Sequence, residues 1–133
     1  MVHRMSNTSL QKPTASELQI LQVLWERGPS TVREVHEVVS VTKQLGYTSV
    51  LKLMQIMTAK GLVTRSEDQR AHVYVACEPA EKTKQQFAMD MMQRVFQGSA
   101  SELMLHALAG RHSSKEELKE LRRLLDEYER KQK

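Results

Sequence analysis

Hydrogen-bonding side chains recur at short intervals between residues 48 and 55, and their chemical types suit contact with a nucleic acid. If residues 48–60 form a helix, its outward face carries Thr48, Ser49, Lys52 and Gln55. Hydroxyl groups suit phosphate oxygens or thymine methyl groups, a glutamine amide can read adenine, and a lysine can reach guanine or a phosphate. A plain solvated surface would usually hold more Glu and Lys, but it could also hold these residues. The surrounding elements must therefore decide between the two interpretations.

Positive charge is concentrated around the same segment. Five basic residues and only two acidic ones lie between positions 43 and 70, the basic ones being Lys43, Lys52, Lys60, Arg65 and Arg70. Tyr47, directly before the predicted helix, is placed to donate a hydrogen bond to a phosphate. The whole chain has a net charge of only +4, a mild excess that suits a polyanionic partner without requiring one. We therefore expect a local positive field around residues 48–55.

Helix starts are marked by four S/T-x-x-E boxes, in which a hydroxyl accepts from a backbone N–H and the Glu reaches back to the cap residue. The pairs are Thr14 with Glu17, Thr31 with Glu34, Ser99 with Glu102, and either Ser113 with Glu116 or Ser114 with Glu117. Each stands directly before a run of apolar residues at helical spacing, so together they predict helices over residues 16–27, 32–39, 101–109 and 115–131. Apolar periodicity predicts two more helices, over residues 48–60 and 80–97.

The first half of the chain has the element order of a winged helix-turn-helix. The inward faces of its three helices are Leu18, Leu21 and Trp25 flanked by Ile20 and Leu24; then Val32, Val35 and Val39; then Val50, Leu53, Met54 and Met57. Gly28-Pro29 stops the first helix, and Gly61 can cap the third in a left-handed conformation. Residues 62–65 and 72–75 are β-branched and aromatic runs around a polar turn, which predicts a β-hairpin. In this order the third helix enters the major groove of DNA, and Arg70 and His72 lie on the wing.

The second half of the chain predicts a helical dimerisation region. Its three helices carry apolar stripes that include Phe87, Met91 and Val95; Leu103 and Leu108; and Leu118, Leu121 and Leu125. So short a helical region cannot bury all three stripes by itself, and a second copy of the chain would cover them. The competing interpretation packs the stripes back on the first half as one monomeric core. We assign residues 1–12 to a flexible lead-in, 13–78 to a winged-helix DNA-binding domain and 79–133 to a dimerisation domain. The predicted fold class is mainly α with a small β-hairpin.

The remaining features favour a cytoplasmic protein that is not an enzyme. The single cysteine, Cys77, excludes an internal disulfide, and we expect it to be a buried small hydrophobe. No apolar run approaches the ~20 residues that cross a bilayer, and the first twelve residues lack the apolar core of a signal peptide. The histidines show no metal-ligand spacing, so we expect no metal and no cofactor. No phosphate loop, nucleophile elbow or paired acid constellation is present.

Several spaced motifs together resemble the penicillinase-repressor family (BlaI/MecI/CopY type). They are PTASEL at residues 13–18, LW at 24–25, TVREV at 31–35, GYTSV at 46–50, KGLV at 60–63, RAHVY at 70–74 and FQGS at 96–99. The resemblance covers about residues 13–128. It implies a homodimeric repressor on a dyad operator with inverted TACA-like elements, with DNA contacts from Tyr47, Thr48, Ser49 and Lys52 and wing contacts from Arg70 and His72. In antibiotic-responsive members a membrane sensor with a metalloprotease domain triggers cleavage within the C-terminal helices.

Two positions depart from the pattern of this family. Ile56 stands where an Arg is common, on the exposed side of the third helix, so one expected DNA contact is missing. His106-Ala107 stands where the beta-lactam repressors have Asn-Phe at their cleavage point. The chain also lacks the C-terminal cysteine cluster of the copper-responsive branch. A protein-interaction adaptor that retains a winged-helix fold is the alternative function, and weak dependence of binding on salt would distinguish it from a repressor.

Overall fold

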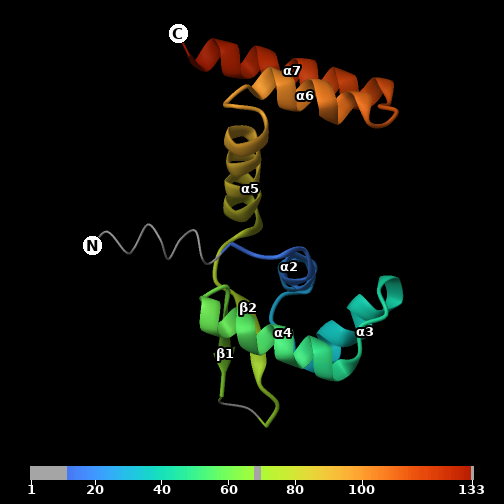
Figure 1. The fold of residues 1–133 in the computed structure, drawn as a ribbon, viewed down its shortest axis with the longest axis vertical. Coiled ribbons are helices and arrows are strands. Elements are labelled where there is room, and N and C mark those ends of the chain that lie inside the picture. Colours follow the sequence, from blue (N-terminus) through green and yellow to red (C-terminus); the bar gives the residue numbers. More distant parts are fainter. Residues whose placement is uncertain (1–11, 68–69, 133) are drawn as a thin grey trace, which may run out of the picture. The chain divides into compact units, whose positions relative to one another are not determined.

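The computed structural model describes residues 12–67 and 70–132, which form six helices and a two-stranded sheet (Figure 1). The chain divides into two compact units between Gln85 and Gln86. The first contains α2 (Ala15–Arg27), α3 (Val32–Thr42), α4 (Tyr47–Lys60), β1 (Val63–Ser66), β2 (Val73–Ala76) and the start of α5 (Ala80–Val95). The second contains the rest of α5, α6 (Ala100–Ala109) and α7 (Lys115–Lys131). The predicted fold class is confirmed. The predicted lead-in lies, apart from Lys12, outside the described residues.

Helix α2 supplies the centre of the first unit. Both arms of its predicted capping box are present, because Thr14 accepts from the Glu17 amide and the Glu17 carboxylate accepts from the Thr14 amide. Its buried apolar residues are Ile20, Leu21, Val23 and Leu24, whereas Leu18 and Trp25 are only partly buried. Of the predicted inward face, Leu21 and the flanking Ile20 and Leu24 are buried, and the centre of the buried face lies nearer to Ile20 and Leu24 than predicted. Because α2 packs against α3, α4 and β2, it buries a wide arc that a single stripe underestimates.

Helices α3 and α4 form the helix-turn-helix pair. Helix α3 begins with the complete Thr31–Glu34 capping box and continues to Thr42, beyond the predicted end at Val39. The predicted core positions Val32, Val35 and Val39 are all buried. Helix α4 begins at Tyr47, and Gly61 caps its end at a φ of 83°, in the left-handed region expected for this glycine.

The wing is an antiparallel hairpin in which Val63 lies opposite Ala76 and Ser66 lies opposite Val73. Each strand begins one position later than predicted from the sequence. Ser30, between α2 and α3, adds a backbone bridge to β2: its amide donates to the Tyr74 carbonyl at 3.1 Å, and the Tyr74 amide donates to the Ser30 carbonyl at 2.8 Å. Tyr74 is almost completely buried. The hairpin is thereby attached to the helical core.

The second unit consists of helical segments with little buried surface of their own. Gln97 and Gly98 end the α5 segment with φ angles of 53° and 84°. Ser99 caps α6, and Ser114, rather than Ser113, caps α7 by accepting from the Glu117 amide at 3.0 Å. Neither α6 nor α7 contains a buried residue. The only buried residue of α5, Thr83, belongs to the first unit.

Candidate nucleic-acid interface

Helix α4 has a sharply divided surface. Val50, Met54 and Met57 have no exposed surface and face the core, while Leu53 is partly buried. The predicted contact residues Thr48, Ser49, Lys52 and Gln55 are all exposed. The apolar contacts of α4 therefore hold one side of the helix and leave open a mainly polar side, which also carries the exposed Ile56.

Tyr47, the first residue of α4, is held by a histidine of the preceding helix. The rings of His36 and Tyr47 meet edge to face, with centroids 5.9 Å apart and an interplanar angle of 81°. The Nε2 atom of His36 lies 3.0 Å from the carbonyl oxygen of Leu45, to which it donates when protonated at that nitrogen. His36 thus orders the turn between α3 and α4 and orients Tyr47. Nothing in the sequence spacing links His36 to Tyr47, so this contact could not be predicted.

An open concavity lies beside α4. Tyr47 and Leu51 of α4 form one side, and the remaining lining residues are Thr31, Val32 and Arg33 at the start of α3 and Ala71, His72 and Tyr74 of the wing. Arg33 and His72 are exposed, so their side chains remain accessible from solvent. Sequence reasoning did not single out Arg33. Its place in the first turn of α3, two residues after the N-cap Thr31, was the available signal.

The basic residues around α4 divide into two groups. Lys43, Lys52 and Arg70 are exposed, and none of them forms an ion pair with a residue in the described ranges 12–67 and 70–132. Lys60 and Arg65, by contrast, are paired within the fold. The Arg65 guanidinium lies 2.7 Å from a Glu67 carboxylate oxygen, and this hydrogen bond raises the pKa of Arg65 and lowers that of Glu67.

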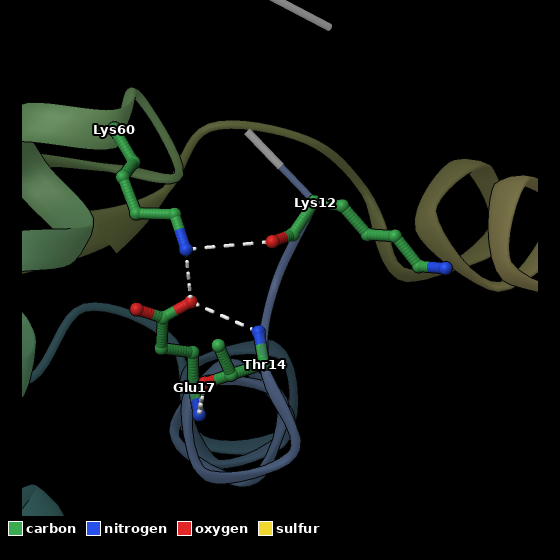
Figure 2. Close-up of polar contacts among 4 residues, drawn as sticks. All are labelled: Lys12, Thr14, Glu17 and Lys60. Atoms are coloured by element: carbon green, nitrogen blue, oxygen red, sulfur yellow. Dashed lines mark hydrogen bonds and ion pairs between the residues drawn. The ribbon is translucent and has the colours of Figure 1, made fainter. Parts of the chain in front are cut away.

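Lys60 differs most from its expected role. Its Nζ atom lies 2.6 Å from Oε1 of Glu17, which is buried at the start of α2 (Figure 2). The expectation that all five cations surround α4 as an open field was therefore wrong for Lys60, whose charge is compensated inside the first unit. Among these five residues, the charge that remains available to a polyanion comes from Lys43, Lys52 and Arg70.

The predicted dimerisation residues are incompletely covered by their own chain. Phe87, Leu103, Leu108, Leu118 and Leu121 are partly buried, and Met91, Val95 and Leu125 are exposed. The exposed fraction reaches 63% for Val95 and 65% for Leu125. These side chains leave an apolar surface on the second unit.

Other candidate chemistry is weak in the part of the chain that the structure describes. No group of three or more His, Cys, Asp or Glu residues there could hold a metal ion. Among the described helices, none has the length and apolar character to span a membrane. Cys77 is exposed, so the expected buried position was wrong, and local desolvation followed by the nearby Glu78 charge raises the pKa of its thiol. A raised pKa disfavours the reactive thiolate.

Comparison with known proteins identifies a family and several related regulators. A family model described as penicillinase repressor matches residues 13–127. The transcriptional regulator BlaI of Mycobacterium tuberculosis is 42% identical over 59 residues, which are 44% of this chain and 43% of that protein. The match therefore spans less than half of the length of that relative. The methicillin resistance regulatory protein MecI of Staphylococcus aureus is 19% identical over 113 residues, which are 85% of this chain and 92% of MecI.

Proposed function

Because the chain belongs to the penicillinase repressor family, we propose that it represses transcription as a homodimer, each copy binding one half-site of a dyad operator. The family consists of transcriptional repressors and not of enzymes. In this proposal residues 13–78 form the DNA-binding domain and residues 79–133 form the dimerisation domain.

The observation that carries the proposal is the polar side of α4. Its hydroxyl, amide and ammonium groups are exposed, while the opposite side is fixed in the core. We assign Thr48, Ser49, Lys52 and Gln55 to the major groove, where such groups reach base edges and neighbouring phosphates. These are the groups that can distinguish one sequence from another.

Residues around α4 would position the protein on the DNA backbone. Tyr47 and Lys43 lie at the start of α4 and before it, and Arg33 lines the same concavity as Tyr47. Arg70 and His72 would contact the backbone from the wing. Such phosphate contacts set orientation and make affinity depend on salt.

The apolar surface of the second unit supports the dimer. Val95, Met91 and Leu125 are exposed in the single chain, and burying them against a second copy would stabilise the pair by the hydrophobic effect. A two-fold dimer also presents its two recognition helices to two symmetric half-sites. This symmetry is what relates the dimer to a dyad operator.

We also predict that an upstream membrane sensor protease releases the repressor from DNA. His106 and Ala107 lie inside α6, and His106 Nε2 is 3.6 Å from a Glu102 carboxylate oxygen. A protease binds extended substrate, so cleavage at this position would require local unfolding of α6. Neither His106 nor Ala107 matches the Asn-Phe pair of the beta-lactam repressors.

The test is selection of DNA by the full chain. Fragmented genomic DNA and a duplex with inverted TACA-like elements are incubated with the protein at two salt concentrations, with excess non-specific competitor. The proposal predicts a discrete, competitor-resistant complex on dyad sequences that weakens steeply as salt rises. Weak binding without sequence preference would contradict it and would favour a protein-interaction adaptor.

A further inference from the structure

A buried carboxylate connects the first helix of the winged unit with the end of the recognition helix. Glu17 is 2% exposed, and one of its oxygens accepts hydrogen bonds from the Thr14 amide at 3.0 Å and from Lys60 Nζ at 2.6 Å. Figure 2 shows this oxygen between the two donors, with the Lys60 ammonium also directed at the Lys12 carbonyl oxygen 3.4 Å away. Lys60 is the last residue of α4, and its side chain is only 23% exposed.

Because Glu17 is buried, the Lys60 ammonium must stay beside its carboxylate. A buried carboxylate is costly when its charge is uncompensated, and removing one member of a buried ion pair exposes the other to that cost. Lys60 supplies the only cation that pairs with Glu17 among the described residues. If its ammonium turned outward to a DNA phosphate, Glu17 would be left buried without a cation.

Helix α4 is therefore fixed at both ends. At its start, the ring of Tyr47 packs on His36, and at its end Lys60 pairs with Glu17 of α2. Val50, Met54 and Met57 fix the side between these points. A shift of the C-terminal end would carry Lys52 and Gln55 away from their places in the groove.

We propose that Lys60 is a positioning residue for DNA recognition: it holds α4 in place through Glu17 and does not itself contact a phosphate. The proposal rests on the function proposed above. The proposal gives Lys60 and Lys52 different roles, although both are lysines of the same helix. It also gives Glu17 a role in DNA binding despite its negative charge.

The ion pair is tested first, without DNA. Urea unfolding of the full chain is compared for Lys60→Met, Glu17→Gln and the double variant. We expect each single change to lower the midpoint and the double variant to be less destabilised than the sum of the two, which identifies direct coupling. Additive effects would show that the two side chains do not stabilise one another and would overturn the proposal.

Operator binding then separates positioning from phosphate contact. Lys60→Met is expected to lower affinity about tenfold, the loss that follows when one base contact is misaligned, with an unchanged slope of log affinity against log salt. A lost phosphate contact would instead reduce that slope by about 1. Lys60→Arg, which keeps the charge, should recover most of the affinity. Lys84→Met, at an exposed position of α5, controls for the loss of one positive charge.

Glu17→Gln provides the sharpest contrast. It removes no cation, so the proposal predicts a loss of affinity similar to that of Lys60→Met, again with an unchanged slope. If Lys60 bound a phosphate, freeing it from Glu17 would retain or raise affinity, and that result would overturn the proposal. Circular dichroism at the assay temperature verifies that each variant is folded. Failure of the wild-type chain to bind any dyad would overturn the proposed function as well, while the unfolding experiment would still decide whether the ion pair exists.

Discussion

The two units of this chain differ in how far they bury their apolar residues. All the buried apolar residues of the described chain lie between Ile20 and Tyr74, within the first unit. In the second unit, α6 and α7 contain no buried residue, and the exposed fraction of Leu125 is 65%. The first unit therefore has a core of its own, whereas the second presents an uncovered apolar surface. In the proposed function, the unit with its own core reads DNA and the unit with the uncovered apolar surface pairs two copies.

The largest expected effect is on the core of the first unit. Met54→Ala should lower the free energy of unfolding by about 2–5 kcal/mol, because Met54 has no exposed surface and its truncation leaves a cavity. Ile56→Ala, on the exposed side of the same helix, is the matched control and should change stability by less than about 0.5 kcal/mol. Urea unfolding at one fixed protein concentration measures both. Equal losses would contradict the assignment of the two sides of α4.

The second largest effect is expected on the association of two chains through the second unit. Leu125→Glu should raise the dissociation constant of the dimer by at least about a hundredfold, because a charge would be buried without a partner at the interface. Lys119→Gln, exposed on the same helix, changes the net charge by the same amount and should leave association nearly unchanged. Sedimentation equilibrium over a range of concentrations provides the measurement. A wild-type chain that stays monomeric throughout would favour the single-core interpretation.

DNA affinity should respond to the polar side of α4 by a smaller amount. Lys52→Ala is expected to cost about 1–3 kcal/mol of binding free energy if the ammonium reaches a base edge, with a changed base preference at one position of each half-site. A uniform loss over all sequences would place Lys52 on a phosphate. Fluorescence anisotropy with operator variants distinguishes these results, and full retention of affinity would remove Lys52 from the interface.

The smallest expected effect concerns helix caps. Thr31→Ala removes one arm of a complete capping box and should destabilise the first unit by about 1 kcal/mol. Ser99→Ala, at the start of α6, removes a hydroxyl that accepts from the Glu102 amide and contacts the Ser101 hydroxyl at the surface, and it should cost less. Urea unfolding followed by circular dichroism compares them, and Thr31→Ser serves as the control that keeps the hydroxyl. A larger loss for Ser99→Ala would contradict the contrast between the units.

Local chemistry made much of the fold predictable from the sequence. The Thr14 and Thr31 caps and the left-handed Gly61 mark helix ends through contacts within a few residues, so their effects can be read directly. The inward side of α4 also follows from helical spacing, since Val50, Met54 and Met57 fall on one side. The exposure of the predicted DNA-binding residues follows from the same spacing, and their contacts with DNA stay predictions.

Contacts between distant segments could not be predicted in this way. The pairing of Lys60 with Glu17 joins the end of α4 to the start of α2, and no local rule sets that partner. Likewise, Arg33 and Tyr47 line the same concavity only because α3, α4 and the wing converge there. A count of basic residues along the chain therefore overestimated the free charge near α4, and it overlooked a cation contributed by another helix.

If one unit reads DNA while the other pairs two copies, a single operator should bind two chains. Native mass spectrometry of the full chain with a duplex containing one dyad should detect two chains per duplex, and Leu125→Glu should lower the occupancy of this species at the same concentration. One chain per dyad at saturation, or no specific complex on any dyad selected from genomic DNA, would contradict the account.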